Sequence, residues 1–330
     1  MNRTKPSAFT FGIYPGGQLG TTAGMTSGPE DKPEKILEAL DLLQGEHYGL
    51  MARCYIIYKG KDIPPAFSNE NPQQYTVNGR QLDLVLSFQS FEERLEGWLD
   101  FIIKIIEEYH PYIAKLQITE EANVNLPVLD GYYPGSRAAL VEGIITAHKK
   151  FKKMGLQIPV GFNATPDFNP DKKFWKEIAL LADQSFYDAL GYVGLDFFPD
   201  VFRPVTGADD EEILKESVKY IISLYREDML RARIQDNIPL HITENGWPTG
   251  EGRSEEKQAE RIEKIIRAVY TLRMQLNITH YEFFGLRDAD SKNEDLFYQF
   301  GIMKDDYTPK KAFFTFKKLI SELGTISETG

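Results

Sequence analysis

Eight short β-type runs alternate with segments of helical period along the chain, and this alternation restricts the folds that it can adopt. The β-type runs are rich in β-branched and aromatic residues and cover Thr10–Tyr14, Leu50–Tyr58, Leu82–Ser90, Ile113–Thr119, Ile158–Phe162, Tyr192–Phe198, Leu240–Thr243 and Thr279–Leu286. Apolar residues recur at helical spacing in Glu34–Gln44, Phe91–Tyr109, Ser136–Met154, Lys172–Leu190, Glu211–Gln235, Glu255–Leu276 and Pro309–Leu323. Such alternation, without a repeat or a linker, predicts a single (β/α)8 TIM barrel over residues 1–330.

A doubly wound open sheet is the alternative, but the chain lacks the Gly-rich dinucleotide turn of that fold. The connection Lys59–Arg80 has several prolines and asparagines and no helical period, so we expect no full helix there. Ser136 is a good N-cap residue for the helix that it begins. The Gly-rich segment Pro15–Pro33 lacks a G-x-x-x-x-G-K pattern, which favours a flexible active-site loop over a phosphate cradle.

Charge and composition exclude several classes of function. The net charge of −11 argues against a nucleic-acid or anionic-membrane partner, because phosphate binding needs a basic face. No stretch approaches 18 uninterrupted apolar residues, so nothing in the sequence predicts a membrane span. Cys54 is the only cysteine, which rules out a disulfide framework and a thiolate metal cluster.

We expect no metal and no cofactor. The five histidines show neither H-x-H nor H-E-x-x-H spacing, so a catalytic metal is not predicted. The first residues, MNRTKPSAFTFG, contain no apolar stretch of a signal peptide, which favours a cytoplasmic location unless a leader has been trimmed. The oligomeric state stays open.

Two β-type runs end in carboxylates. The apolar run that Pro239 opens stops at Glu244, before Asn-Gly and Pro-Thr-Gly turns, and the run Ile113–Thr119 stops at Glu120 and Glu121. A carboxylate at the end of a buried strand is costly to desolvate unless something uses it. In a barrel these ends meet at one face, so the two acids can face each other across a bound substrate.

Paired carboxyl groups of this kind suit glycoside hydrolysis. A separation of about 5–5.5 Å suits double displacement, and a wider pair suits inversion. One group must be ionised to attack, while the other must have a raised pKa to protonate the leaving oxygen. Sequence alone gives no distance between them.

The segment ITENGWPTG resembles the strand-seven signature of clan A glycoside hydrolases, close to the ETGWP of family 17 and the TENG of family 1. The segments FFGLRDADSKNED and FYQFGIMKDDYTPKKAF are similar to the strand-eight region of both families, and MARCY looks like the clan's strand-two arginine segment. The segment EEAN looks like the clan's Asn-Glu-Pro-Asn. The length suits family 17 better than family 1.

This resemblance implies roles for individual residues. Glu244 resembles the nucleophile and Glu121 the general acid/base. Arg53 would lie beside Glu244 and hold its pKa low, or else form a structural ion pair. Glu120 stands where the clan has an asparagine that binds a sugar hydroxyl. Because adjacent strand residues face opposite ways, Glu120 rather than Glu121 could be the inward acid.

Other positions depart from the resemblance or are candidates for sugar contacts. Asp196 and Phe198 replace what resembles the Asn-x-Tyr of strand six, so a phenol that would orient the nucleophile is missing there. The Glu-Trp that family 1 uses to bind a distal sugar is absent after Asp288. Aromatic platforms or core residues, and polar groups for sugar hydroxyls, are expected at Phe284, Trp247, Asn163, Asp288 and Tyr14.

The sequence thus predicts a retaining β-glycoside hydrolase that acts on small or oligomeric β-glycosides through Glu244 and Glu121. A catalytically silent barrel that binds carbohydrate or serves as a scaffold is the alternative from another class. A barrel lyase or aldolase would need an active-site lysine, and the strand-borne candidate, Lys115, lies well below the end of its strand. The sugar, the linkage and exo or endo action stay open.

Overall fold

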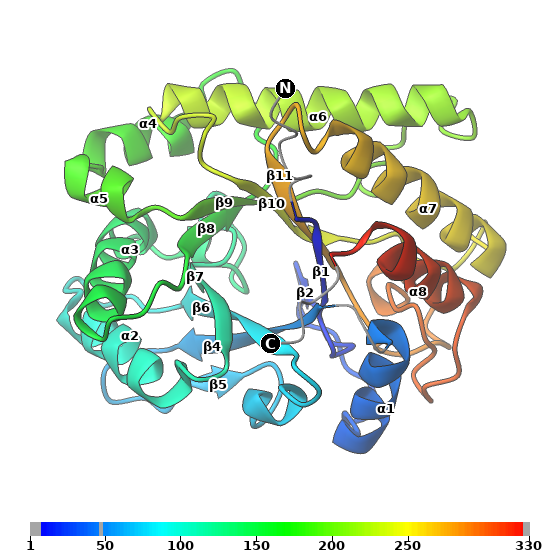
Figure 1. The fold of residues 1–330 in the computed structure, drawn as a ribbon, viewed down its shortest axis with the longest axis horizontal. Helices are drawn as coiled ribbons and strands as arrows, with labels where there is room; N and C mark the ends of the chain where they lie inside the picture. Colours follow the sequence, from blue (N-terminus) through cyan, green and yellow to red (C-terminus); the bar gives the residue numbers. More distant parts are fainter. Residues whose placement is uncertain (1–7, 46–48, 326–330) are drawn as a thin grey trace, which may run out of the picture.

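A closed barrel of eight parallel strands forms the centre of the computed structural model, which describes residues 8–45 and 49–325 (Figure 1). The strand order is β1-β11-β10-β9-β8-β7-β6-β4, and β1 also pairs with β4, which closes the sheet. The predicted TIM barrel is therefore confirmed. Its strands are β1 (Thr10–Ile13), β4 (Leu50–Tyr58), β6 (Gln81–Phe88), β7 (Ile113–Ile118), β8 (Val160–Ala164), β9 (Tyr192–Asp196), β10 (Leu240–Asn245) and β11 (Ile278–Phe283).

The helices surround the barrel and follow the predicted order. They are α1 (Pro33–Gln44), α2 (Glu96–Tyr109), α3 (Ser136–Lys153), α4 (Lys173–Leu181), α5 (Gln184–Ala189), α6 (Glu211–Arg231), α7 (Glu255–Leu272) and α8 (Lys311–Leu323). The single helix expected over Lys172–Leu190 is two helices. The Asp183 side chain accepts a hydrogen bond from Phe186 N (3.1 Å) and so caps the start of the second helix, α5. Ser136 is not an N-cap, since Gly135 occupies that position.

The connections that follow β1 and β4 contain short elements. The Gly-rich segment forms a hairpin of β2 (Gly20–Thr21) and β3 (Gly24–Met25). The connection after β4 contains β5 (Ala66–Phe67), which pairs antiparallel with β4, and a short 3₁₀ turn, η1 (Pro72–Tyr75). Further 3₁₀ turns are η2 (Asp130–Tyr132) and η3 (Leu296–Tyr298).

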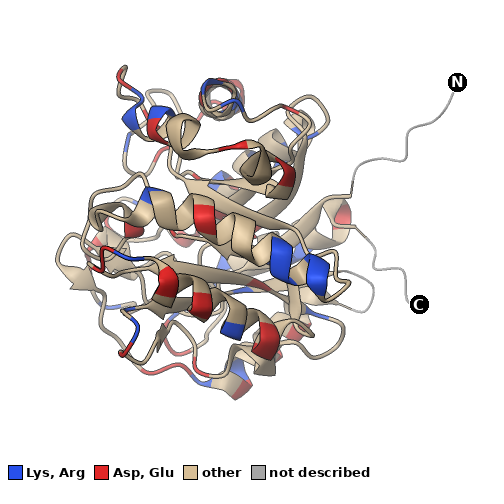
Figure 2. Cartoon of the chain, turned by 90° about the vertical axis from the view of Figure 1, so that its left-hand side faces the viewer, with Lys and Arg blue, Asp and Glu red and all other residues tan. Residues whose placement is uncertain are grey.

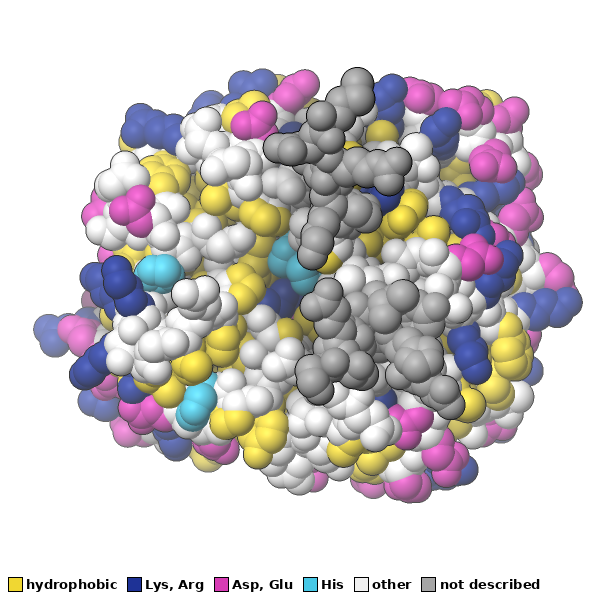
Figure 3. All heavy atoms as spheres, viewed as in Figure 1, with side chains coloured by type: hydrophobic (Ala, Val, Ile, Leu, Met, Phe, Trp, Pro, Cys, Tyr) yellow, Lys and Arg dark blue, Asp and Glu magenta, His cyan; other side chains and the backbone are white. Residues whose placement is uncertain are grey.

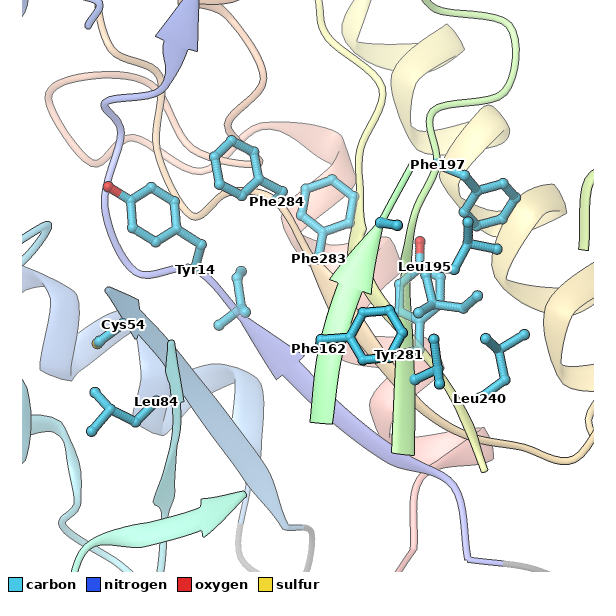
Figure 4. Close-up of a cluster of buried hydrophobic side chains, with 14 of the residues drawn as sticks. Tyr14, Cys54, Leu84, Phe162, Leu195, Phe197, Leu240, Tyr281, Phe283 and Phe284 are labelled. Atoms are coloured by element: carbon cyan, nitrogen blue, oxygen red, sulfur yellow. The ribbon is translucent and has the colours of Figure 1, made fainter. Parts of the chain in front are cut away.

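The hydrophobic core lies mainly between the sheet and the helices. Phe162 and Leu195, on β8 and β9, and Leu240 on β10 are buried there (Figure 4). Removing such side chains from water is the main contribution to stability. Charges of both signs lie on the outer faces of the helices (Figure 2) and around the face seen in Figure 3. Among the described helices, none combines the length and apolar character that a membrane span requires.

The interior of the barrel is polar instead. Arg53 on β4 forms an ion pair with Asp83 on β6, and Lys115 on β7 forms one with Glu282 on β11, all four being buried. A side chain at Gly12 would come within 2.7 Å of Glu282 Cγ, so glycine there leaves room for this charge. Buried charges need partners, and this network places Arg53 directly beneath the mouth of the barrel.

Candidate active site

Four carboxyl groups meet at the face where the strands end. They belong to Glu120 and Glu121 after β7, Asp196 at the end of β9 and Glu244 on β10. One carboxylate oxygen from each lies within 4.8 Å of those from the other three. The structure therefore brings together the acids of the two carboxylate-ending strands, and it adds Asp196 to them.

These acids open into a large cavity of about 1470 Å³. Tyr14, Tyr55 and Phe284 line it on one side of the acids. The rings of Tyr14 and Phe284 stack, with centroids 4.9 Å apart and planes inclined by 10°. Figure 4 shows the two side chains next to each other. A flat aromatic pair beside Glu244 is a suitable surface for the apolar face of a sugar.

The backbone after β7 turns both neighbouring glutamates into the site. Thr119 and Glu121 have left-handed backbones, with φ of 68° and 44°. Simple strand alternation would send Glu120 and Glu121 to opposite faces, and that expectation is wrong here. Positive φ is rare outside glycine and clusters at functional sites.

Three donors hold the Glu120 carboxylate. Arg53 Nη2 lies 3.2 Å from Oε2, Gln117 Nε2 donates to the same oxygen at 2.7 Å, and Asn163 Nδ2 donates to Oε1 at 3.1 Å. Burial still raises the pKa of Glu120. With both oxygens hydrogen-bonded, this acid is fixed in position.

The Glu121 carboxyl group has a different environment. Its backbone N–H donates to Asn163 Oδ1 at 2.8 Å, but no described residue donates a hydrogen bond to its carboxylate. Burial, together with the charges of Glu244 and Glu120, raises the pKa of Glu121 well above its usual value. This group is therefore suited to hold a proton and to release it to a ligand in the cavity.

Glu244 has a phenol and a guanidinium beside it. Tyr55 Oη donates a hydrogen bond to Glu244 Oε1, and Arg53 Nε lies 3.7 Å from the same oxygen. Burial and the nearby Glu120 raise the pKa of Glu244 to about 8, while Arg53 and Tyr55 act in the opposite direction. An irregularity in the pairing of β9 with β10, between Ile242 and Glu244, coincides with the point where this side chain turns into the mouth.

Asp196 completes the group of acids. Thr243 Oγ1 donates to its Oδ1 at 2.6 Å, and Asn163 Nδ2 donates to its Oδ2. Burial and the charges of Glu244 and Glu120 raise the pKa of Asp196 well above its usual value. The cavity thus holds more carboxyl groups than nearby cations, so burial and mutual repulsion favour the protonated form of some of these groups.

The phenol expected to be missing is supplied from another strand. Phe198, in the position where the resemblance has a tyrosine, lines the cavity without a hydroxyl. Tyr55 provides the hydroxyl from β4, two residues beyond Arg53 and therefore on the same face of that strand. Sequence reasoning missed it, although this period-2 spacing was a usable signal.

A second missed residue is Asp130, which supports the turn after β7. Its carboxylate accepts hydrogen bonds from Phe88 N (2.6 Å), Glu120 N (2.8 Å) and Ser87 Oγ. Burial raises the pKa of Asp130 to about 7. Nothing in the local sequence distinguishes this aspartate, because all of its partners but Glu120 lie on another strand.

Two sequence candidates, Trp247 and Asp288, lie away from the cavity that the acids line. Trp247 is buried, with 2% exposure, beneath the guanidinium of Arg253, and it does not line the cavity. Asp288 forms a buried ion pair with Lys310 (2.7 Å) and accepts a hydrogen bond from Gly301 N (3.0 Å). Arg53 and Asn163 do not line the cavity themselves but contact the acids that do. Arg53 lies beside Glu120 and Glu244. Asn163 contacts Glu120, Glu121 and Asp196.

The four clustered oxygens are close enough to ligate one hard cation together. Several of their lone pairs already accept hydrogen bonds, and the guanidinium of Arg53 supplies a positive charge at the same point. The arrangement therefore suits proton chemistry between carboxyl groups better than the binding of a cation.

Comparison with known proteins gives similarity in structure only. No protein-family model and no curated protein sequence matches the chain. A β-D-glucuronidase of Dictyoglomus thermophilum is similar over 98% of this chain and 52% of that one, with 14% identity and a TM-score of 0.61. A family 39 glycoside hydrolase of Bacteroides cellulosilyticus WH2 is similar over 97% of this chain and 64% of that one, with 12% identity and a TM-score of 0.62.

A β-glucuronidase of Ruminococcus gnavus, solved with D-glucuronic acid, is similar over 96% of this chain and 49% of that one, with 15% identity and a TM-score of 0.60. This chain spans about half the length of these glucuronidases. At such identities the likeness shows a fold that glycoside hydrolases use. Fold alone does not establish an activity.

Proposed function

We propose that the protein is a retaining β-glycoside hydrolase, with Glu244 as nucleophile and Glu121 as general acid/base. The observation that carries this proposal is the approach of their carboxylate oxygens to within 4.8 Å of each other at the mouth of the cavity. Retaining enzymes hold their two carboxyl groups about 5–5.5 Å apart, whereas inverting enzymes need room for a water molecule between them. The glycosidase neighbours support the same class of reaction.

The environments of the two acids support these roles. Glu244 is beside Arg53 and accepts from Tyr55, so of the two it is better stabilised as an anion. Glu121 has no donor among the described residues and a pKa raised by burial and by Glu244, so it is the better proton donor. Pairs of acids whose environments separate their pKa values are typical of acid/base assignments.

In the first step, Glu244 attacks the anomeric carbon while Glu121 gives its proton to the glycosidic oxygen, and the C–O bond to the leaving group breaks. The glycosyl-enzyme ester forms on Glu244. In the second step, Glu121 takes a proton from water, whose oxygen attacks the anomeric carbon and releases Glu244. Asn163 helps to position Glu121, since it accepts a hydrogen bond from the Glu121 backbone N–H and donates one to Glu120.

A panel of aryl β-glycosides, including glucosides, galactosides and glucuronides, tests the proposal. We expect one member to be hydrolysed with retention of the anomeric configuration, observed by NMR. The matching 2-deoxy-2-fluoro glycoside should label Glu244 in peptide mass spectra. Glu244→Ala and Glu121→Ala should each reduce kcat at least about 10³-fold, and azide should restore turnover in one of them.

Wild-type-like turnover in either variant, or an inverted product, would contradict the assignment. Saturable binding of sugars without turnover of any glycoside would instead favour the silent carbohydrate-binding barrel.

A further inference from the structure

Phenylalanine side chains form a continuous surface along one part of the cavity. Phe198 lies 5.5 Å from Phe202 and 5.7 Å from Phe300, measured between ring centroids, and Phe202 lies 5.7 Å from Phe297. All four line the same cavity as the acids, and we call them the phenylalanine wall. Phe202 is 52% exposed, so the wall is open to a ligand.

The wall flanks the strand that carries Glu244. Phe198 and Phe202 follow β9, whereas Phe297 and Phe300 follow β11, and both of these strands pair with β10. Tyr14 and Tyr55, by contrast, follow or belong to β1 and β4. In a glycoside whose sugar is held by Glu244 and Glu121, the part beyond the glycosidic oxygen is the part that can be apolar and contact the wall.

Apolar side chains continue beyond the wall. Ile213 and Tyr220 on α6 are 43% and 63% exposed and line the same cavity, as do Leu126 and Val128 of the loop after Glu121. Exposed apolar groups that adjoin one another in a cavity mark a binding surface.

A second sugar fits such a surface poorly. Each pyranose carries several hydroxyl groups, and burying a hydroxyl without a hydrogen-bond partner is unfavourable. The four wall residues have no polar side-chain atoms, whereas aromatic rings favour stacked or edge-to-face contacts with other rings. The cavity of about 1470 Å³ also exceeds the roughly 300–1,000 Å³ that is usual for a drug-sized ligand.

We propose that the phenylalanine wall binds the aglycone, and that the natural substrates are β-glycosides of a flat, apolar, multi-ring alcohol. The inference rests on the proposed glycosidase function and specifies its leaving group. Phe198, Phe202, Phe297 and Phe300 contact the aglycone rings, while the sugar lies over Glu244 and Glu121.

The test compares phenyl and 2-naphthyl β-glycosides of one sugar, because their leaving groups have similar acidity and differ by one ring. A second ring that buries on the order of 50 Å² of apolar surface at about 25 cal/mol per Å² corresponds to about a tenfold higher kcat/KM. Phe202→Ala should remove most of this gain, so that it lowers kcat/KM several-fold more for the naphthyl glycoside than for the phenyl glycoside. The control is Phe314→Ala, because Phe314 is 61% exposed on α8 and outside the cavity.

A binding measurement separates failure of this inference from failure of the proposed function. Free 2-naphthol, followed by its fluorescence, should bind the wild-type protein saturably and bind Phe202→Ala several-fold more weakly. Equal binding to both proteins, or faster hydrolysis of a disaccharide than of the naphthyl glycoside, would overturn the assignment of the wall. Binding that depends on Phe202 without turnover of any glycoside would refute the glycosidase and retain the apolar site.

Discussion

Tyr55 donates its hydroxyl hydrogen to Glu244, and Arg53 Nε in turn donates to the Tyr55 oxygen at 2.7 Å. Both donors come from β4, whereas the carboxyl group is on β10. The guanidinium therefore stabilises the Glu244 anion twice, by its own charge and through the phenol. In our proposal, these two interactions together distinguish Glu244, as the nucleophile, from the three other acids.

Tyr55→Phe removes the hydrogen bond to the proposed nucleophile and, with it, the acceptor of Arg53 Nε. The Glu244 anion loses a donor in a buried site, so we expect kcat to fall about 10- to 100-fold, which corresponds to about 1.4–2.7 kcal/mol. The acidic limb of the pH–rate profile should also move to higher pH, because a less stabilised carboxylate has a higher pKa. Steady-state kinetics between pH 4 and pH 9 measure both effects.

The matched control is Tyr58→Phe on the same strand. Tyr58 Oη donates to Glu92 Oε2 at 2.7 Å and does not line the cavity. Its kcat should stay within about twofold of wild type. If both variants lose activity equally, the hydrogen bond to Glu244 has no special part in turnover.

Glu120→Gln should move both limbs of the pH–rate profile to lower pH. The Glu120 charge raises the pKa of Glu244 and of Glu121, so its removal lowers the pKa of both groups. The expected shift is on the order of one pH unit. Glu142→Gln, at an exposed position of α3, should leave the profile unchanged. Movement of only one limb would show that Glu120 acts on one acid alone.

Glu121→Gln should stabilise the protein at alkaline pH while it abolishes turnover. The pKa of Glu121 is raised in the folded protein, so folding favours the neutral acid. Its unfavourable contribution is absent below the ordinary carboxyl pKa and grows as the pH rises through the folded value. Glutamine stays neutral, so the free energy of unfolding should rise by about 1–3 kcal/mol at pH 8 and change little at pH 4.

Thermal unfolding at pH 4 and pH 8 measures this difference, with Glu142→Gln again as the surface control. A variant that is less stable than wild type at pH 8 would argue that Glu121 is ionised and well solvated in the folded protein.

Metal removal should have no effect. In our proposal the four clustered acids exchange protons and bind no cation, so dialysis against EDTA should leave kcat unchanged. Added Mg²⁺ or Ca²⁺ at 1 mM, on the order of the weakest extracellular calcium affinities, should not raise Tm. A Tm increase that Glu120→Gln removes would instead identify a cation site among these carboxylates.

The barrel could be predicted from the sequence because its signal is local. Residues such as Ile102 and Ile106 repeat at helical spacing. The β-branched and aromatic run Leu50–Tyr58 predicts both ends of β4 correctly. The helix over Lys172–Leu190 was predicted as one element because apolar period alone does not reveal the cap at Asp183.

The site was predictable only in part. Glu244 and Glu121 could be found because each ends an apolar strand. Tyr55 could be placed on the same face as Arg53 by period-2 spacing, but its partner Glu244 lies on another strand. Asp130 could not be assigned, because the sequence around it does not show which backbone groups it contacts. The shared inward orientation of Glu120 and Glu121 depends on left-handed backbone angles that strand periodicity does not predict. Trp247 and Asp288 follow strand ends, yet both are buried and neither lines the cavity.

Arg53 contacts Asp83 in the barrel floor and Glu120 and Glu244 in the mouth. One guanidinium thus belongs to the scaffold and to the chemistry at once. If the proposed function holds, a redesign of the floor for greater rigidity, for example by replacing Asp83 with an apolar residue, would alter the pH at which the protein works without changing a group that meets the substrate.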